Sequence, residues 1–486
     1  MSYLDCSIEE IHQALVDKKT TVLELTKEAI ERAKKDTCNS FEYICEKEAL
    51  EFAEKINNEL PDNLFFGIPY VVKDNYSTKG IPTTGSSDIL KDYVPIFNAT
   101  VIEKLQAAKA VLIGKTTLDE LAMGGTGTTG HLGKTFNPYD NKHERLVGGS
   151  SCGSASSVAA SIIPFSLGSD TGDSIRKPAS LAGLVGYKPT WGSISRFGLF
   201  PFCPSLDTVG FFTRSVKDSA YIFDLLRGKD VHDLTSFNLP NFSIENFKNN
   251  SEKKFKFLVV KEIIESIPDE FYKTKFNELI LKLEAEGNEI EIVEFGKDLL
   301  ESFFPTYFVI SCAEATSNNA NLDGLKFGNL QWEDDFNQMV KKTRTEGFGH
   351  LIKKRFIIGS YCLLKENQEE LYLNAKRNRN KIVNKAKELL SKGDCFLMPT
   401  APSFAPKFDE SLDQLSENYL IADNHLCLAN FGGFPSLTLP LALEDKLPLG
   451  VNVTSLPFED EKVFSIGKKI EGITGLKGLC AGDNHE

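Results

Sequence analysis

Residues 147–176 read VGGSSCGSASSVAASIIPFSLGSDTGDSIR. Five glycines and nine serines lie in this segment, around one apolar run at residues 158–169. A flexible linker would share the Gly/Ser content, but it would have no reason to carry that run. The length and apolarity of the run predict a buried helix followed by a buried strand. Two Ser/Gly turns on either side of one packed unit are typical of a functional site on a rigid scaffold.

The residues before this segment alternate between helix and strand patterns. Capping boxes at Ser7–Glu10 and Thr21–Glu24 predict two opening helices. Residues 67–74, GIPYVVKD, predict a short buried strand that carries Lys73 at its end. Further predicted elements are helices at 46–60 and 102–108 and a strand at 110–114. This alternation favours an α/β fold with a largely parallel sheet.

The residues after the segment continue the same alternation. Predicted strands lie at 255–260, 289–293 and 395–398, predicted helices at 269–286 and 367–390, and a closing strand pair at 435–441 and 449–455. No composition shift marks a linker, and we find no internal repeat. We therefore expect a single domain over residues 1–486.

Composition narrows the class of protein. The 486 residues are 41% hydrophobic and carry a net charge of −13, which argues against binding a phosphate backbone directly. We see no apolar run near the length that crosses a bilayer and no signal-peptide pattern, so we expect a cytoplasmic protein without membrane contact. The ten cysteines form no CxxC pair and have no zinc-finger spacing, which favours a reducing compartment and no metal site.

The catalytic residue types in residues 147–176 are limited. This segment contains no histidine, and the chain has neither a GxSxG elbow with a matching acid and base nor a P-loop. The remaining candidates for catalysis are the serines of this segment and a lysine from an earlier predicted strand. That combination suggests a serine nucleophile activated by lysine, a known variant of the catalytic triad.

Three segments resemble the amidase signature family, whose pattern reads GGSSGGS and then DTGGSIR. They are GGSSCGS at 148–154, DTGDSIR at 170–176 and GIPYVVKDN at 67–75. The resemblance implies the amidase signature fold, an α/β fold with a large mixed β-sheet covered by helices on both faces. It also implies a signature core at about 60–215 and a more variable, helix-rich part at about 240–395.

The resemblance implies roles for individual residues. Ser174 would be the nucleophile, Ser150 a bridging serine on a cis peptide, and Lys73 the base. Lys73 must then be neutral, which costs about 4–5 kcal/mol at pH 7 unless burial lowers its pKa. The oxyanion hole would be formed by the backbone N–H groups of Thr171, Gly172, Asp173 and Ser174.

Three neighbours have supporting roles in this interpretation. Ser151 would be a hydrogen-bond partner within the site, and Arg176 would hold the loop through carboxylate or carbonyl contacts. Asp170 fits two interpretations equally, as a turn-forming residue or as a support of the site.

Two residues depart from the family pattern, because Cys152 and Asp173 each replace a glycine. A thiol nucleophile at Cys152 is disfavoured, because its position is not that of the nucleophile. Asp173 is the more serious departure, since it adds a negative charge beside a developing anion. We expect its carboxylate to turn away and activity to survive.

Further segments resemble a branch of the family, the glutaminase subunits of tRNA-dependent amidotransferases. They are 114–123, 205–210, 313–317 with 322–328, and 346–349 with 353–355. The resemblance implies that Arg355 holds the α-carboxylate of glutamine and Asp423 its α-ammonium, a cation and an anion for a zwitterionic substrate. The alternative for Arg355 is a helix-surface charge in the run Lys353-Lys-Arg355.

This branch implies an activity and partners. The chain would hydrolyse glutamine and pass ammonia to a B subunit, within a heterotrimer that also contains a C subunit. The B subunit would hold most of the tRNA and use ATP and Mg²⁺ to convert Glu-tRNA(Gln) to Gln-tRNA(Gln), with Asp-tRNA(Asn) as a second candidate. This chain would bind no cofactor. The alternatives are a free-standing amidase acting on a small carboxamide and a catalytically impaired scaffold protein.

Overall fold

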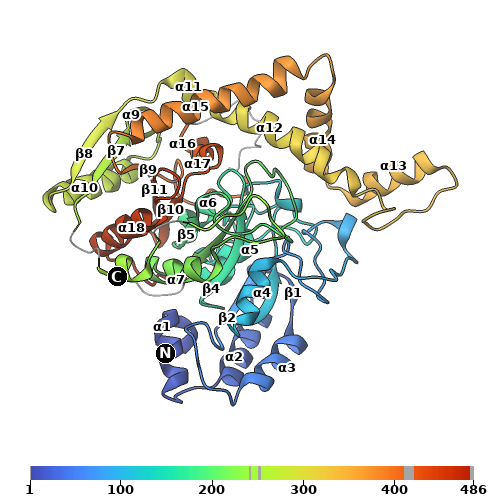
Figure 1. Ribbon diagram of the computed structural model, residues 1–486, viewed down its shortest axis with the longest axis horizontal. Coiled ribbons are helices and arrows are strands. Elements are labelled where there is room, and N and C mark those ends of the chain that lie inside the picture. Colours follow the sequence, from blue (N-terminus) through green and yellow to red (C-terminus); the bar gives the residue numbers. More distant parts are fainter. Residues whose placement is uncertain (1, 240–241, 250–252, 410–420, 482–486) are drawn as a thin grey trace.

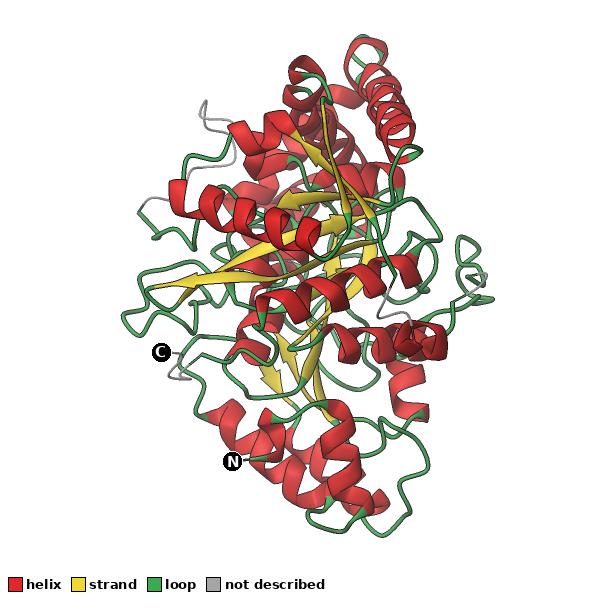
Figure 2. Cartoon of the chain, turned by 90° about the vertical axis from the view of Figure 1, so that its left-hand side faces the viewer, coloured by secondary structure: helices red, strands yellow, loops and turns green. Residues whose placement is uncertain are grey.

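The structure is a computed structural model that describes residues 2–239, 242–249, 253–409 and 421–481. Within these residues, eleven strands form one sheet in the order β1-β3-β2-β4-β6-β5-β10-β11-β9-β7-β8. Figure 2 shows the strands in the middle of the molecule, with helices on either side of them. The architecture is the large mixed sheet with covering helices that the family resemblance implied.

The first two helices begin as their capping boxes predict. Ser7 precedes α1 (Ile8–Val16) and Thr21 precedes α2 (Val22–Lys34), and each side chain accepts from the backbone N–H three residues later. The apolar faces of both helices are buried in the large apolar core, and α2 packs against β1 (Phe41–Ile44) and α3 (Glu46–Ile56). These elements lie together at the lower end of the molecule in Figure 1.

The signature core is built around β2 (Pro69–Lys73), which is buried along its whole length. This strand runs parallel to β3 (Val111–Thr116) on one side and to β4 (Phe165–Asp170) on the other. The run predicted as helix then strand is α5 (Cys152–Ala159) followed by β4, as expected. Because parallel strands end at the same sheet edge, Lys73 and Asp170 arrive at one place. The core also contains α4 (Thr100–Ala107), α6 (Arg176–Leu181), β5 (Val185–Lys188), β6 (Thr208–Thr213) and α7 (Val216–Leu226).

The second half of the sheet belongs to the C-terminal part of the chain. Its strands are β7 (Lys256–Val260), β8 (Glu289–Val293), β9 (Cys395–Pro399), β10 (Ser436–Glu444) and β11 (Leu447–Thr454). The first three confirm the predicted strands, and the closing pair is an antiparallel hairpin that is longer than expected.

The helices of this half are α8 (Ile244–Asn249), α9 (Lys261–Glu265), α10 (Glu270–Ala285), α11 (Lys297–Glu301), α12 (Phe303–Asn318), α13 (Phe336–Gly347), α14 (His350–Leu363), α15 (Asn374–Leu390), α16 (Ile421–Asn424), α17 (Cys427–Gly432) and α18 (Asp460–Thr474). Figure 1 shows α11, α12, α14 and α15 at the opposite end of the molecule from α1–α3, whereas α18 packs beside α7, α8 and β10. The helix expected at 367–390 is α15, preceded by one π-helical turn at Glu369–Leu373. No helix in these described ranges is long and apolar enough to span a membrane.

The expectation of a largely parallel sheet is wrong. Of the ten strand pairings, six are antiparallel and four are parallel. Parallel pairing is confined to β3-β2-β4 and to β9-β7-β8, where a helix separates consecutive strands. The antiparallel β6, β5 and β10–β11 lie between these two groups.

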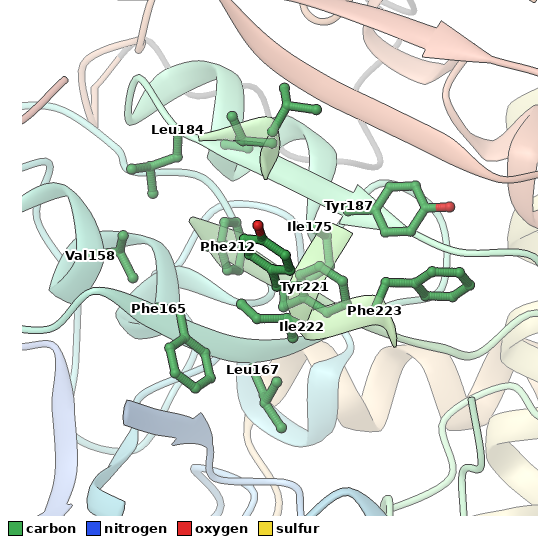
Figure 3. Close-up of a cluster of buried hydrophobic side chains, with 14 of the residues drawn as sticks. Val158, Phe165, Leu167, Ile175, Leu184, Tyr187, Phe212, Tyr221, Ile222 and Phe223 are labelled. Atoms are coloured by element: carbon green, nitrogen blue, oxygen red, sulfur yellow. The ribbon is translucent and has the colours of Figure 1, made fainter. Parts of the chain in front are cut away.

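A buried apolar cluster supports the segment that follows β4. Figure 3 shows Ile175 among side chains from β4, β6 and α7, with Leu167, Phe212 and Ile222 among its labelled members. Ile175 is fully buried and follows Ser174 directly. Burial of an Ile side chain contributes about 1.5–3 kcal/mol, so the core fixes the backbone next to the expected nucleophile.

Candidate active site

Lys73 ends β2 with its side chain among serine hydroxyl groups. Its Nζ lies 2.7 Å from Ser150 Oγ, 3.0 Å from Ser151 Oγ and 3.0 Å from Ser169 Oγ. The side chain is fully buried. The hydrogen-bonded partners are serine oxygens, and among the residues that the structure describes no carboxylate is bound to Nζ to stabilise the ammonium form.

Burial lowers the pKa of Lys73 to about 8. Asp119, Asp170 and Asp207 oppose this shift at longer range, but the loss of hydration outweighs them. Roughly a tenth of the lysine is then neutral at pH 7, compared with less than a thousandth at the free-lysine value. A neutral Nζ beside Ser150 can accept a proton from that hydroxyl.

Ser150 follows a cis peptide bond, Gly149–Ser150, as the resemblance implied. A second residue shapes this turn, because Asp119 donates its backbone N–H to Ser150 O over 3.1 Å. The space beside Gly149 is closed, since a Cβ there would lie 2.0 Å from Asp119 Oδ2. Glycine is therefore the residue that fits at this position.

Asp119 is a residue of this region that the sequence reasoning did not identify. Its carboxylate, which is fully buried, accepts hydrogen bonds from four successive backbone N–H groups at residues 126–129, over 2.9–3.1 Å. The carboxylate thereby holds the Gly/Thr-rich loop 124–130 against the turn at Ser150. The available signal was a lone aspartate after a buried strand and before GGTGTTG.

The candidate site has two arms: the turn at Ser150 is the first, and residues 170–176 after β4 are the second. A buried ion pair between Asp170 and Arg176 holds the second arm. Arg176 donates to both carboxylate oxygens, over 3.1 Å from Nε and 2.9 Å from Nη2, and both side chains are fully buried. Burial alone would raise the pKa of Asp170, but Arg176 lowers it below its ordinary value. Asp170 also accepts from Ile175 N over 3.0 Å, so it closes the turn that follows β4.

The loop between Asp170 and Ile175 presents its backbone N–H groups without internal acceptors. Within the described ranges, no residue accepts a hydrogen bond from the backbone N–H of Thr171, Gly172, Asp173 or Ser174. Arg176 Nη2 donates to Gly172 O over 2.7 Å, which fixes the carbonyl side of the loop. Fixed, unpaired N–H groups are what an oxyanion hole requires.

The structure assembles part of the expected triad. Lys73 and Ser150 are bonded directly, with Ser151 and Ser169 completing the cluster; Ser151 Oγ also donates to Ser169 O over 3.1 Å. Ser174 lies five residues after Ser169 and is 4% exposed. Across the described part of the chain, no hydrogen bond joins the Ser174 hydroxyl to Ser150.

Asp173 is paired with a cation that the sequence reasoning did not anticipate. Its carboxylate lies 2.9 Å from Lys177 Nζ, and the same Nζ lies 2.9 Å from Asp423 Oδ1. Burial raises the pKa of Asp173, and Lys177 opposes that rise. Burial alone would lower the pKa of Lys177, but Asp173 and Asp423 raise it above its ordinary value. The signal in the sequence was the Asp–Lys spacing of four residues.

Arg355 is not a helix-surface charge, since it is 2% exposed within α14. Its guanidinium lies 5.2 Å from the ring of Phe308 and 5.9 Å from that of Phe202. Asp423 lies on α16, with its side chain 45% exposed and bonded to Lys177. The two residues expected to bind the ends of glutamine therefore have different neighbours: aromatic rings surround Arg355, and Lys177 pairs with Asp423.

Tyr307 on α12 lies against the loop that contains Ser174, and no sequence signal marked it. A Cβ on Gly172 would lie 3.0 Å from the Tyr307 ring, so glycine lets the ring approach the backbone. Burial raises the pKa of the Tyr307 hydroxyl well above its usual value, with Arg355 opposing and Asp173 adding to the rise. This tyrosine therefore lies in the electrostatic field of both Arg355 and Asp173.

Cys152 does not have the features of a reactive thiol. It is 1% exposed, and burial raises its pKa to about 12, so the thiol stays protonated near neutral pH. Within the ranges that the structure describes, no group of three or more His, Cys, Asp or Glu side chains could hold a metal ion.

Comparison with known proteins decides the family, because the family model described as Amidase matches residues 24–464. The chain belongs to the amidase family. Its relatives include the A subunit of glutamyl-tRNA(Gln) amidotransferase from Pediococcus pentosaceus, 36% identical over 486 residues that cover 98% of each chain. The protein of the same name from Thermotoga maritima is 40% identical over 407 residues, 84% of each chain. The crystal structure of the Thermotoga protein superimposes on this amidase with a TM-score of 0.80 at 34% identity, covering 97% of this chain and 95% of that one.

Proposed function

We propose that this amidase is the glutaminase component, the A subunit, of a tRNA-dependent amidotransferase. The observation that carries the proposal is the buried Lys73 beside Ser150, with the loop that contains Ser174 at the same sheet edge. The near-full-length similarity to relatives named as the A subunit of such an enzyme favours this function over a free-standing amidase. The cation beside Asp173 removes the one feature that supported a catalytically impaired scaffold.

The chemistry follows from the groups at the site. Ser174 Oγ would attack the side-chain amide carbon of glutamine as its proton passes to Ser150, whose own proton passes to neutral Lys73. The N–H groups of residues 171–174 would stabilise the tetrahedral oxyanion. Return of the proton to the departing nitrogen releases ammonia and leaves a glutamyl ester on Ser174. Water, activated by the same bases, then releases glutamate and restores the serine.

Substrate recognition would use the two charged ends of the amino acid. Arg355 would bind the α-carboxylate through its planar guanidinium, and Asp423 would bind the α-ammonium. Arg355 is buried, so an ion pair with the substrate would form in a region of low dielectric. Ser151, Asp170 and Arg176 would hold the two arms in position relative to each other.

Partners complete the proposed reaction. The ammonia would pass to a B subunit that holds most of the tRNA and uses ATP and Mg²⁺ to amidate Glu-tRNA(Gln), or Asp-tRNA(Asn), and a C subunit would complete a heterotrimer in the cytoplasm. The net charge of −13 supports delegating tRNA contact to a partner. We expect this chain to bind no cofactor of its own.

The test uses the complex purified with its partner subunits. In Ser174→Ala, glutamine-driven amidation of Glu-tRNA(Gln) should fall by about 1,000-fold or more, because the nucleophile is lost, while ammonia-driven amidation is retained. Ser391→Ala, at an exposed serine beyond α15, is the matched control. Equal loss of both activities in Ser174→Ala would contradict the proposal.

A further inference from the structure

Lys177 is a charged residue beside the candidate active site to which neither the proposed chemistry nor the proposed substrate contacts give a role. Its Nζ lies 2.9 Å from Asp173 and 2.9 Å from Asp423, and it also donates to the backbone oxygen of Asp423 over 3.2 Å. The side chain is 13% exposed. One ammonium thus joins the residue before the nucleophile to an acid that is 250 residues away in the sequence.

The position of Lys177 follows from local structure. Lys177 N donates to Asp173 O over 2.9 Å, which closes the turn that begins α6. Residues four apart on such a turn lie one above the other, so the side chain of residue 177 covers that of residue 173.

The negative charge of Asp173 lies beside the expected oxyanion hole, and Lys177 is its counter-ion. The backbone at Asp173 does not have the positive φ that would require glycine, so its Cβ is tolerated and the charge remains as the difficulty. A carboxylate on a residue whose N–H would bind the oxyanion repels that oxyanion at short range. In a partly desolvated site, such a repulsion slows a reaction by roughly 100-fold to 1,000-fold.

We propose that Lys177 is a positioning residue for glutamine hydrolysis. Its ammonium neutralises Asp173 and holds that carboxylate toward α16 instead of the oxyanion hole. The same ammonium fixes Asp423 beside the nucleophile loop. Two carboxylates and one ammonium leave a net charge of −1, so this three-residue group keeps an attraction for the α-ammonium of glutamine. The inference rests on the proposed glutaminase function.

The test compares single and double variants in the complex with its partner subunits, by glutamate release at saturating glutamine. Lys177→Met should lower kcat by at least about 100-fold, because Asp173 loses its counter-ion. Asp173→Gly removes the carboxylate and keeps the backbone N–H, so it is the reference for the double variant. The double variant Asp173→Gly/Lys177→Met should have a kcat within about threefold of that of Asp173→Gly, because no carboxylate then needs neutralising. Lys273→Met, which breaks an exposed pair with Glu270, is the control.

The double variant separates this role from a structural one, since a lysine needed only for folding would not be rescued by removing Asp173. If Lys177→Met does not fold, an active double variant still supports the proposal, and an inactive one overturns it. If Lys177→Met folds and its kcat is within about threefold of wild type, the proposal is also overturned. A wild-type complex without Ser174-dependent glutamate release would contradict the proposed function itself.

Discussion

At the scale of single residues, burial changes the acid–base behaviour of a common side chain. Lys73 is an ordinary lysine in composition, yet its place at the end of a fully buried strand removes its hydration. Serine hydroxyl groups satisfy its Nζ without supplying negative charge. A carboxylate at the same distance would have held the lysine protonated and useless as a base.

This environment predicts the pH dependence of glutamine hydrolysis. Lys73 accepts a proton only when neutral, and its pKa is lowered to about 8, so its active form increases as pH rises through that value. We expect kcat/KM to rise about tenfold per pH unit below pH 8 and to level off above it. The profile should be measured on the complex from about pH 6 to pH 9, with Lys79→Met as an exposed-lysine control. A profile that is flat across this range would contradict the role of Lys73.

The residues found from the sequence and those missed differ in a physical respect. Lys73, Ser150 and Ser174 lie in short motifs whose chemistry is fixed by neighbours along the chain. Lys177 and Tyr307 contact residues of other elements. Only folding brings Asp423 to Lys177 and Gly172 to Tyr307, so no local pattern could predict these contacts; the Asp173–Lys177 spacing of four residues was the one local signal.

At the scale of elements, α5 and β4 set the distance between the two arms of the site. Every residue of both elements is buried, and β4 pairs with β2 through Val72 and Leu167 directly before Lys73. The core therefore fixes where both arms begin. The turn at Ser150 then depends on the loop 124–130, which Asp119 holds in place.

Removal of the charge on Asp119 should loosen this turn. In Asp119→Asn, one acceptor oxygen becomes a donor that faces backbone N–H groups, and each unsatisfied group costs about 1–3 kcal/mol. We expect peptides covering residues 119–131 to exchange their amide hydrogens faster and kcat to fall by at least about tenfold. Hydrogen-exchange mass spectrometry and glutamate release measure the two effects.

The control for this prediction is Asp445→Asn, in the exposed turn between β10 and β11. It should change neither exchange at residues 119–131 nor kcat. If Asp119→Asn retained wild-type exchange and activity, the loop would not need its buried carboxylate. The position of Ser150 would then depend on contacts other than those of the Asp119 carboxylate.

The fold could be predicted in its elements but not in its strand directions. Capping boxes and apolar runs located α1, α2, β2, β7 and β8 because those signals are local. An apolar run carries no information about which way its partner strand runs. The antiparallel β6, β5 and β10–β11 are set by tertiary pairing, so the largely parallel sheet expected from alternation was wrong.

At the scale of the whole molecule, one sheet joins the two halves of the chain. β10 pairs with β5 of the signature core, and β11 pairs with β9 of the C-terminal half. The two largest buried apolar clusters mix the halves: one contains Leu167 with Phe257, and the other contains Phe202 with Ile352. We find no plane in the described structure that would separate two independent cores.

This continuity predicts that the amidase unfolds as one cooperative unit, as expected of a single domain. The chain has two tryptophans, and Trp332 is 73% exposed, so Trp332→Phe leaves Trp191 of the signature core as the only tryptophan reporter at little cost in stability. Trp191 fluorescence follows the first half, whereas circular dichroism at 222 nm also follows the helices between residues 261 and 390. The two urea midpoints should agree within about 0.2 M. Two separated transitions would show that the halves are independent domains, despite the strands that they share.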